Sequence, residues 1–214
     1  MSNGRKPKFA TADWYIGHAN SIKFDNRPFQ DVGEMHRALI RNYNAQVPAN
    51  GICYFLGDIG THSSELTKSI LSQLNGTKVI IVGNHDKNTD ALYQMGFDVV
   101  LHSATTYIQG ERVTMSHCPL RGVFREDVSD MKGAKEGDNW HGEHKNQAFS
   151  VENEGQFHLH GHVHSPNGGK STKILNRQYD VGVVANGYRP VPFSIIESWI
   201  SRTKAEENGN EKSE

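Results

Sequence analysis

The 214-residue sequence has few cysteines and no long apolar run, and each shortage excludes a class of protein. The two cysteines, Cys53 and Cys118, are too few for a disulfide framework and indicate a reducing compartment. Neither lies in a stretch typical of a zinc–thiolate site. No segment approaches the ~20 apolar residues of a membrane span, and no secretory signal opens the chain. We therefore expect a soluble, cytoplasmic protein with no membrane partner.

The sequence also lacks an excess of charge of either sign. Its 23 Lys and Arg against 24 Asp and Glu leave a formal charge of −1. Nucleic-acid binding is therefore possible through a local patch but is not favoured by the net charge. The length and the 36% hydrophobic content suit one large core. We expect one domain over 1–203 and a charged, unstructured tail over 204–214. The polar connection 119–155 is expected to be either a functional lid or disordered.

Hydrophobic patterning predicts an α/β chain. Apolar runs at 9–12, 52–56 and 78–82 are typical of buried strands. Helical spacing follows the capping pair Asp31 and Glu34, and occurs again over 66–74. The second half is expected to be rich in strands, which we place at 98–101, 106–109, 112–116, 156–160, 178–184 and 193–199. Two mixed sheets packed face to face, with helices outside, would accommodate this order as a four-layer α/β/β/α sandwich.

The run from Phe157 to His164 places a histidine at every second position. In an extended strand these imidazoles share one side, an arrangement that indicates either a metal site or a half-solvated surface strand. Motifs upstream favour the metal site, because each follows an apolar segment that is predicted to be a strand. In chain order they are Asp13, Gly57-Asp58, Gly83-Asn84-His85-Asp86 and His117.

This order of motifs resembles the calcineurin-like metallophosphoesterases, which are binuclear metal hydrolases of phosphate esters. The resemblance extends from about Lys8 to Ile200 and is nearest to the compact bacterial and phage-type members. Their first motif continues into a stretch similar to Gly17-His18-Ala19-Asn20, and their end resembles 181–191. The resemblance implies the metallophosphatase fold and two divalent ions, which the mixed oxygen and nitrogen ligands limit to Mn, Fe, Zn, Co or Ni.

The ligand set is also implied by the resemblance. The first ion would take Asp13, the side chain at Tyr15, Asp58 and His164. The second would share Asp58 and take Asn84, His117 and His162. His85 would act at the scissile phosphate as an acid or an electrostatic clamp, oriented by Asp86. Additional roles near the metal ligands or the substrate are expected for His18, His160, Arg121 and Arg189. Taken singly, each of these residues has an ordinary structural explanation, such as a turn, a helix cap or a surface charge.

The sequence departs from the family at its first motif, which reads Asp13-Trp14-Tyr15 instead of Asp-X-His. A phenol must lose its proton to bind a metal ion as phenolate, and phenolate is a harder ligand than imidazole. Tyr15 is therefore expected either to favour an oxygen-loving ion, to weaken the first site, or to pack beside the site without binding. His18 is the nearest imidazole that would compensate.

The expected function is hydrolysis of a phosphodiester or a small nucleotide-like phosphate ester. The phosphoprotein phosphatases of the superfamily carry arginines around the Gly-Asp and Asn-His turns, and 57–60 and 84–87 contain none. Two alternatives stay open. One is a metal-dependent nuclease, which would show a basic groove and steep salt dependence. The other is a catalytically weakened protein that binds a phosphate ligand or a partner.

Overall fold

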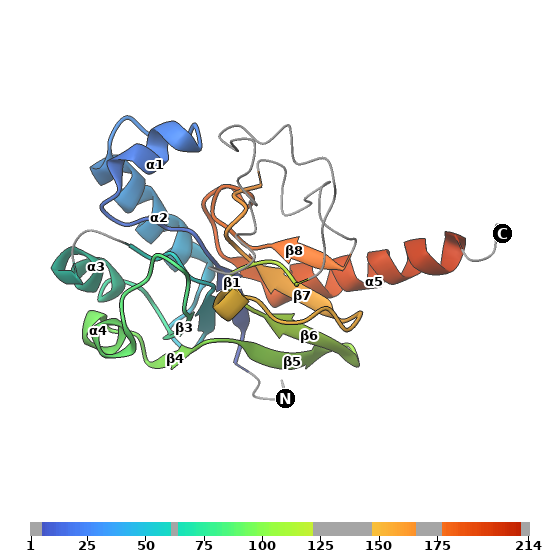
Figure 1. The fold of residues 1–214 in the computed structure, drawn as a ribbon. Helices are drawn as coiled ribbons and strands as arrows, with labels where there is room; N and C mark the ends of the chain where they lie inside the picture. The colour runs from blue at the N-terminus through green and yellow to red at the C-terminus, as the bar shows by residue number, and fades with distance from the viewer. Residues whose placement is uncertain (1–5, 61–63, 122–146, 166–176, 211–214) are drawn as a thin grey trace, which may run out of the picture.

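The chain forms two mixed β-sheets that face each other, with helices packed against the first sheet (Figure 1). The computed structural model describes residues 6–60, 64–121, 147–165 and 177–210. The first sheet has the order β4-β3-β2-β1-β9 and the second the order β5-β6-β7-β8. The expectation of an α/β chain with two mixed sheets is confirmed.

The first sheet is built from βα units. Its strands are β1 (Lys8–Thr11), β2 (Ile52–Phe55), β3 (Thr77–Ile81), β4 (Val99–Leu101) and the short β9 (Val191–Pro192). Strands β1 to β4 are parallel and β9 is antiparallel to β1. Between them lie α1 (Ala19–Phe24), α2 (Val32–Gln46), α3 (Ser64–Leu71) and α4 (Thr89–Met95). Parallel strands direct their carboxyl ends to one edge of the sheet, where a site can form.

Helix α2 shows how the sequence sets the local structure. It begins where Asp31 accepts a hydrogen bond from the Glu34 amide at 2.7 Å, and Glu34 in turn accepts one from the Gln30 amide. Its buried side presents Met35, Leu39 and Tyr43 to the sheet. Tyr43 meets Trp14 and Phe55 with ring centroids 5.8 Å apart in both pairs. Burying each such ring contributes about 1.5–3 kcal/mol, which fixes the helix on the sheet.

The second sheet consists of β5 (Ala104–Ile108), β6 (Glu111–Met115), β7 (Phe157–His160) and β8 (Gln178–Asp180). Strands β5 and β6 are antiparallel, whereas β6, β7 and β8 are parallel. A short 3-10 turn, Gln147–Phe149, precedes β7. The apolar face of this sheet packs against the first sheet through a core that includes Ala10, Ile81, Met115 and Leu159.

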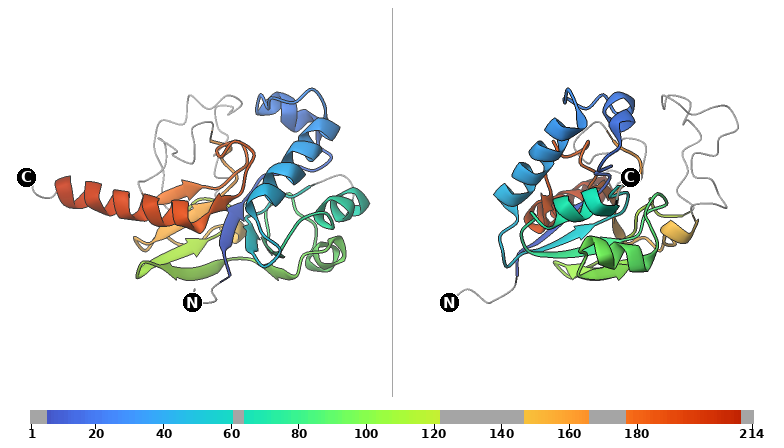
Figure 2. Two further views of the ribbon diagram at one scale, coloured as in Figure 1. Left: turned by 180° about the vertical axis from the view of Figure 1, so that it is seen from behind. Right: turned by 90° about the vertical axis from the view of Figure 1, so that its left-hand side faces the viewer.

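The segment 193–199 is helical, so the strand predicted there is wrong. It opens α5 (Phe193–Asn210), whose C-terminal part projects beyond the sheets (Figures 1 and 2). Aromatic and β-branched composition favoured a strand, but Ile196, Trp199, Ile200 and Thr203 are buried at helical spacing. Trp199 packs edge-on against Phe157, so α5 belongs to the core between the sheets.

The expected unstructured tail is also wrong over 204–210, where α5 continues. Lys204 contacts Glu111 and Arg177 donates two hydrogen bonds to Glu207, which ties this charged end of the helix to the second sheet. Residues 211–214 lie outside the described residues. Within the described part of the chain, no helix combines the length and the apolarity that crossing a bilayer requires.

Candidate metal centre

Five chain segments deliver the candidate ligands to one place, each within three residues of a strand end. Asp13 follows β1, Asp58 follows β2, Asn84 follows β3, His117 follows β6 and His162 follows β7. The Asp13 amide donates to the Gly57 carbonyl at 3.1 Å, which joins two of these loops. The His162 amide donates to the Asp13 carboxylate at 3.0 Å, which joins the two sheets. The ends of both sheets therefore form one buried centre.

His117 shows why this centre suits a cation. Its Nδ1 lies 2.7 Å from the carbonyl oxygen of Leu56, which can only accept, so Nδ1 carries the proton. Its Nε2 lies 2.9 Å from Asn84 Oδ1, 3.2 Å from His162 Nδ1 and 3.5 Å from Asp58 Oδ1. In the neutral ring this nitrogen directs a lone pair at the acceptor oxygens of Asn84 and Asp58, and a shared cation satisfies all three atoms.

Asp58 lies between the two groups of expected ligands. Its Oδ2 accepts a hydrogen bond from the Tyr15 hydroxyl at 2.6 Å, and its Oδ1 faces His117 and accepts from the His85 amide at 3.1 Å. The side chain is fully buried. One ligand atom each of Asp13, Asp58 and His117 lies within 4.8 Å of the others. Asp58 is therefore placed to contact ions on both of its sides.

His164 belongs to a chain of contacts that the sequence analysis missed. Its Nε2 is 3.6 Å from Asp13 Oδ1, and its Nδ1 is 2.8 Å from Asp25 Oδ1. Asp25 also accepts two hydrogen bonds from Arg27, at 2.9 and 2.7 Å. Arg27 is buried and donates to the carbonyls of Asp13 and Trp14. Asp25 thus orients the His164 imidazole, and Arg27 holds the backbone of Asp13 and Trp14. Residues that support metal ligands from outside act in this way.

These acids and imidazoles shift one another's pKa values. Burial alone would raise the pKa of Asp13, but His164, His117 and His162 hold it below its usual value. Burial alone would lower the pKa of His164, but Asp13 and Asp25 raise it to about 10. Burial raises the pKa of Tyr15, and the carboxylates of Asp58 and Asp13 raise it further. Tyr15 is therefore a protonated donor to Asp58, and phenolate would form only with a cation present.

Most of the non-glycine residues with left-handed backbone in the described part of the chain lie here. Of eight non-glycine residues with positive φ, five are candidate ligands. They are Asp13, Tyr15, Asp58, His162 and His164, with φ between 47° and 70°. Each such residue costs about 1 kcal/mol or more, so the surrounding hydrogen bonds must hold the loops in place. Backbone strain of this kind accumulates at functional sites.

Glycines allow the loops to approach so closely. A Cβ at Gly161 would lie 2.5 Å from the Ala12 Cβ and 2.6 Å from Asp13 Oδ2. A Cβ at Gly83 would lie 2.5 Å from Asp58 Oδ1. Both neighbours are buried and fixed, so a side chain at either position would displace a carboxylate of the centre.

His85 and Asp86 do not interact as predicted. Both carboxylate oxygens of Asp86 accept backbone amides, from Asp58 at 3.0 Å, Ile59 at 2.9 Å and Gly83 at 2.7 Å. Asp86 therefore joins the loops after β2 and β3 instead of orienting His85. Burial and the nearby Asp58 raise its pKa to about 6. The His85 side chain is exposed, and its ring lies 6.2 Å from that of Tyr15.

The alternating histidines divide into two pairs. His158 and His160 lie in β7 and stack with centroids 5.9 Å apart, whereas His162 and His164 lie in the bends beyond the strand. His158 contacts Thr114, Ser116 and Cys118 on the polar face of the second sheet, and burial lowers its pKa to about 3. His160 is buried, with Nδ1 2.8 Å from the Gly161 carbonyl. His162 and His164 contact other expected ligands directly, whereas His160 interacts with Asp13 and His117 only through their charges.

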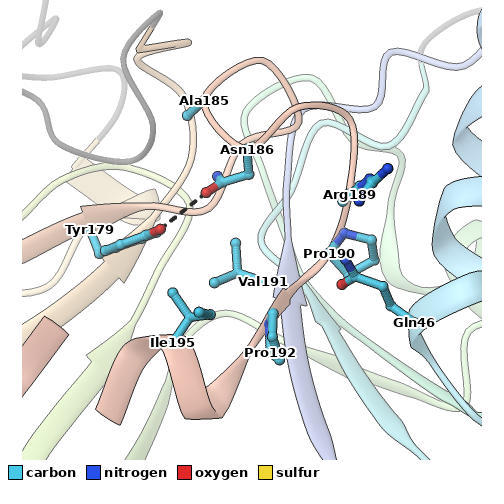
Figure 3. Close-up of a pocket in the computed structure, with 9 residues that line it drawn as sticks. All are labelled: Gln46, Tyr179, Ala185, Asn186, Arg189, Pro190, Val191, Pro192 and Ile195. Carbon is cyan, nitrogen blue, oxygen red and sulfur yellow. Dashed lines mark hydrogen bonds between the residues drawn. The ribbon is translucent and has the colours of Figure 1, made fainter. Parts of the chain in front are cut away.

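The remaining predicted residues lie around the centre or away from it. His18 caps α1 by accepting the Ser21 amide at 3.1 Å, and its ring lies 5.7 Å from Tyr15. Arg121 pairs with Glu152 at 2.7 Å. Arg189 is exposed and lines a shallow hollow with Gln46 and Pro190, none of them an expected ligand (Figure 3). Most of the connection 119–155 lies outside the described residues, including Arg125 and Lys132, two further cations that would be available to a phosphate.

Tyr15 variants are expected to reveal whether the phenol binds metal. Tyr15→His should tighten the weaker of two metal affinities, because a neutral nitrogen donor replaces a phenol that must lose its proton. Tyr15→Phe should weaken that site by roughly 10-fold or more if phenolate binds, and change little if the ring only packs. Calorimetric titration with Mn²⁺ measures both. Unchanged affinity and stoichiometry in both variants would show that Tyr15 does not bind the ion.

The metal-free protein is expected to lose stability as pH rises from 6.5 to 10. The pKa of His164 is raised in the folded state, so its charged form stabilises the fold fully below the ordinary value of 6.5 and less as the imidazole loses its proton. The free energy of unfolding should fall by about 1–3 kcal/mol over this range. Urea unfolding with a chelator present measures it. His164→Gln should flatten the slope, and an unchanged slope would contradict the assignment.

Comparison with known proteins identifies relatives without a described function. No protein-family model matches the chain. A stretch of 81 residues, 37% of this chain, is 43% identical to the uncharacterized protein MJ1445 of Methanocaldococcus jannaschii. The match spans 46%, about half, of that relative's length. Among solved structures, the protein of unknown function AQ665 from Aquifex aeolicus matches with a TM-score of 0.65 and 20% identity, over 91% of this chain and 99% of that one. This second likeness shows a shared fold alone.

Proposed function

We propose that the chain is a binuclear metal-dependent phosphohydrolase with the metallophosphatase fold of the calcineurin-like superfamily. One observation carries the proposal. Around His117 Nε2, a carboxylate, an amide oxygen and a second imidazole converge within 3.5 Å. Ligands of this kind, delivered from the ends of two sheets, fit a pair of borderline metal ions. The order of the motifs along the chain supports the same assignment.

The donors divide around Asp58. Tyr15 contacts Asp58 Oδ2, and its ring lies 5.3 Å from that of His164, which contacts Asp13. His117 faces Asp58 Oδ1 and contacts Asn84 and His162. Two ions held in this way would neutralise phosphoryl oxygens and lower the pKa of water, which is the chemistry that ester hydrolysis requires. Burial alone would raise the pKa of Asp13, but His164, His117 and His162 hold it below its usual value, which favours the carboxylate that a metal ion requires.

His85 is the group that remains for the leaving oxygen. Its backbone is fixed by the amide hydrogen bond to Asp58, while its side chain is exposed beside Tyr15. An imidazole in this position donates a proton to the departing alkoxide or stabilises its charge. Arginines are absent from 57–60 and 84–87, which favours a phosphodiester or small nucleotide-like ester over a phosphoprotein.

Chelation is expected to abolish hydrolysis, because among the ligand residues no side chain is placed as a nucleophile of its own. The test is a screen of nitrophenyl phosphodiesters, cyclic nucleotides, phosphomonoesters and oligonucleotides with added Mn²⁺, before and after exhaustive demetallation. Full activity in the demetallated protein would contradict the mechanism. Stoichiometric metal binding without turnover of any substrate would favour the binding-protein alternative.

A further inference from the structure

The Cys118 side chain lies among the donors expected for the ion next to His117. One ligand atom each of Cys118, His117 and His162 lies within 4.8 Å of the other two. Cys118 is 3% exposed and His117 is 0% exposed. Two imidazoles and a thiol at this separation match the mixed nitrogen and sulfur donors of many zinc sites.

The backbone around Cys118 is fixed on both sides, so its position does not depend on the thiol itself. Its amide donates to the Phe149 carbonyl at 2.9 Å. Its carbonyl accepts from the Ser116 hydroxyl at 2.9 Å and lies 3.1 Å from His158 Nε2. His117, the preceding residue, is held by its contact with the Leu56 carbonyl. The His–Cys pair is therefore presented together at the end of β6.

We propose that Cys118 is an additional ligand of the ion bound by His117 and His162. The inference rests on the proposed metal centre and goes beyond the ligand set that its motifs imply. Ideal Zn–S and Zn–N bonds place donors about 3.6 Å apart. The His117 and His162 nitrogens are 3.2 Å apart, and the ligand atom of Cys118 lies within 4.8 Å of those of both histidines. When the metal–sulfur bond forms, the S–H bond breaks and its proton leaves to solvent.

A thiolate on this side makes the two halves of the centre chemically different. Tyr15 adds oxygen next to Asp58 Oδ2, while Cys118 adds sulfur next to the imidazoles of His117 and His162. Sulfur selects thiophilic ions such as Zn²⁺ and Fe²⁺ over Mn²⁺. The side next to His117 is therefore expected to retain Zn²⁺ in competition with Mn²⁺.

Cobalt substitution tests the inference independently of catalysis. The full chain is titrated with Co²⁺, and near-ultraviolet absorption is recorded for sulfur-to-cobalt charge transfer together with the bound stoichiometry. We expect the band in the unchanged protein and its loss in Cys118→Ser and Cys118→Ala. Cys53→Ser is the matched control, because Cys53 is also buried but lies within β2. Zn²⁺ affinity should fall by about 100-fold or more in the Cys118 variants, at least as much as loss of an outer partner costs.

The outcomes separate this inference from the proposed function. Cobalt binding with hydrolysis but without the band would overturn Cys118 ligation and leave the phosphohydrolase assignment standing. A band that survives in folded Cys118→Ala would also overturn it. Absence of any cobalt binding in the folded, unchanged protein would overturn both. Circular dichroism confirms that each variant is folded before its spectrum is compared.

Discussion

Replacing Asp58 by asparagine is expected to lower kcat/KM by roughly 10³-fold or more and to lower the metal content. The amide keeps the shape of the side chain. Its one oxygen can still accept from the His85 amide, while its NH2 group replaces the oxygen that accepts from the Tyr15 hydroxyl. It removes the negative charge that two cations would share, and metal ions supply several kcal/mol of transition-state stabilisation. Steady-state kinetics with metal analysis of the purified variant measures both effects.

Asp90→Asn is the matched control for this substitution. Asp90 is exposed in the first turn of α4 and has no part in the centre, so the same loss of charge should leave kinetics and metal content unchanged. If Asp58→Asn kept both ions and near-normal activity, the shared position proposed for Asp58 would be wrong.

Replacing His85 by alanine is expected to lower kcat by roughly 10²-fold or more on esters with poor leaving groups, the usual scale for a lost general acid. Esters with good leaving groups, such as nitrophenolate, should lose less because their oxygen departs without a proton. Metal content should not change, because the described contact of His85 with the centre is made by its backbone amide.

His102→Ala provides the matched control, since His102 is an exposed histidine that lies between β4 and β5. It should leave both classes of substrate unaffected. Equal losses on good and poor leaving groups in His85→Ala would assign His85 an electrostatic role in place of proton donation. Loss of metal would make it a ligand.

The sequence predicts the fold well where the pattern of apolar residues follows the buried face of a strand or helix. Strands β1, β2 and β3 and helix α2 begin and end within a few residues of their predicted positions, because apolar runs and the Asp31 cap are local signals. Over 193–199 the composition suggested a strand, while the buried positions follow helical spacing. That spacing is a local helical signal which composition outweighed in the strand prediction, and the contact of Trp199 with Phe157 buries the helical face.

For the candidate site, the motifs that follow strands predict residues that the structure brings together. The sequence does not predict residues whose contact with the site joins positions far apart in the chain. Asp25 reaches His164 from a position 139 residues away in the sequence, so nothing local relates the two. Asp86 looks like an orienting carboxylate beside His85, but its oxygens are used by amides of neighbouring loops. Cys118 has no second cysteine near it in the sequence, and its relation to His162 arises only when β6 and β7 pair.

The left-handed turns at Asp13, Asp58 and His162 have a consequence for how the proposed ions would be acquired. Amides of the chain itself donate the hydrogen bonds that hold these turns, so the proposed ions would not be needed to shape them. Binding energy is then not consumed in folding the chain, and an ion can leave without unfolding it. A site of this kind would exchange its ions, so under the proposed function the cellular metal supply, together with the chemistry of the donors, would determine which ions the protein carries.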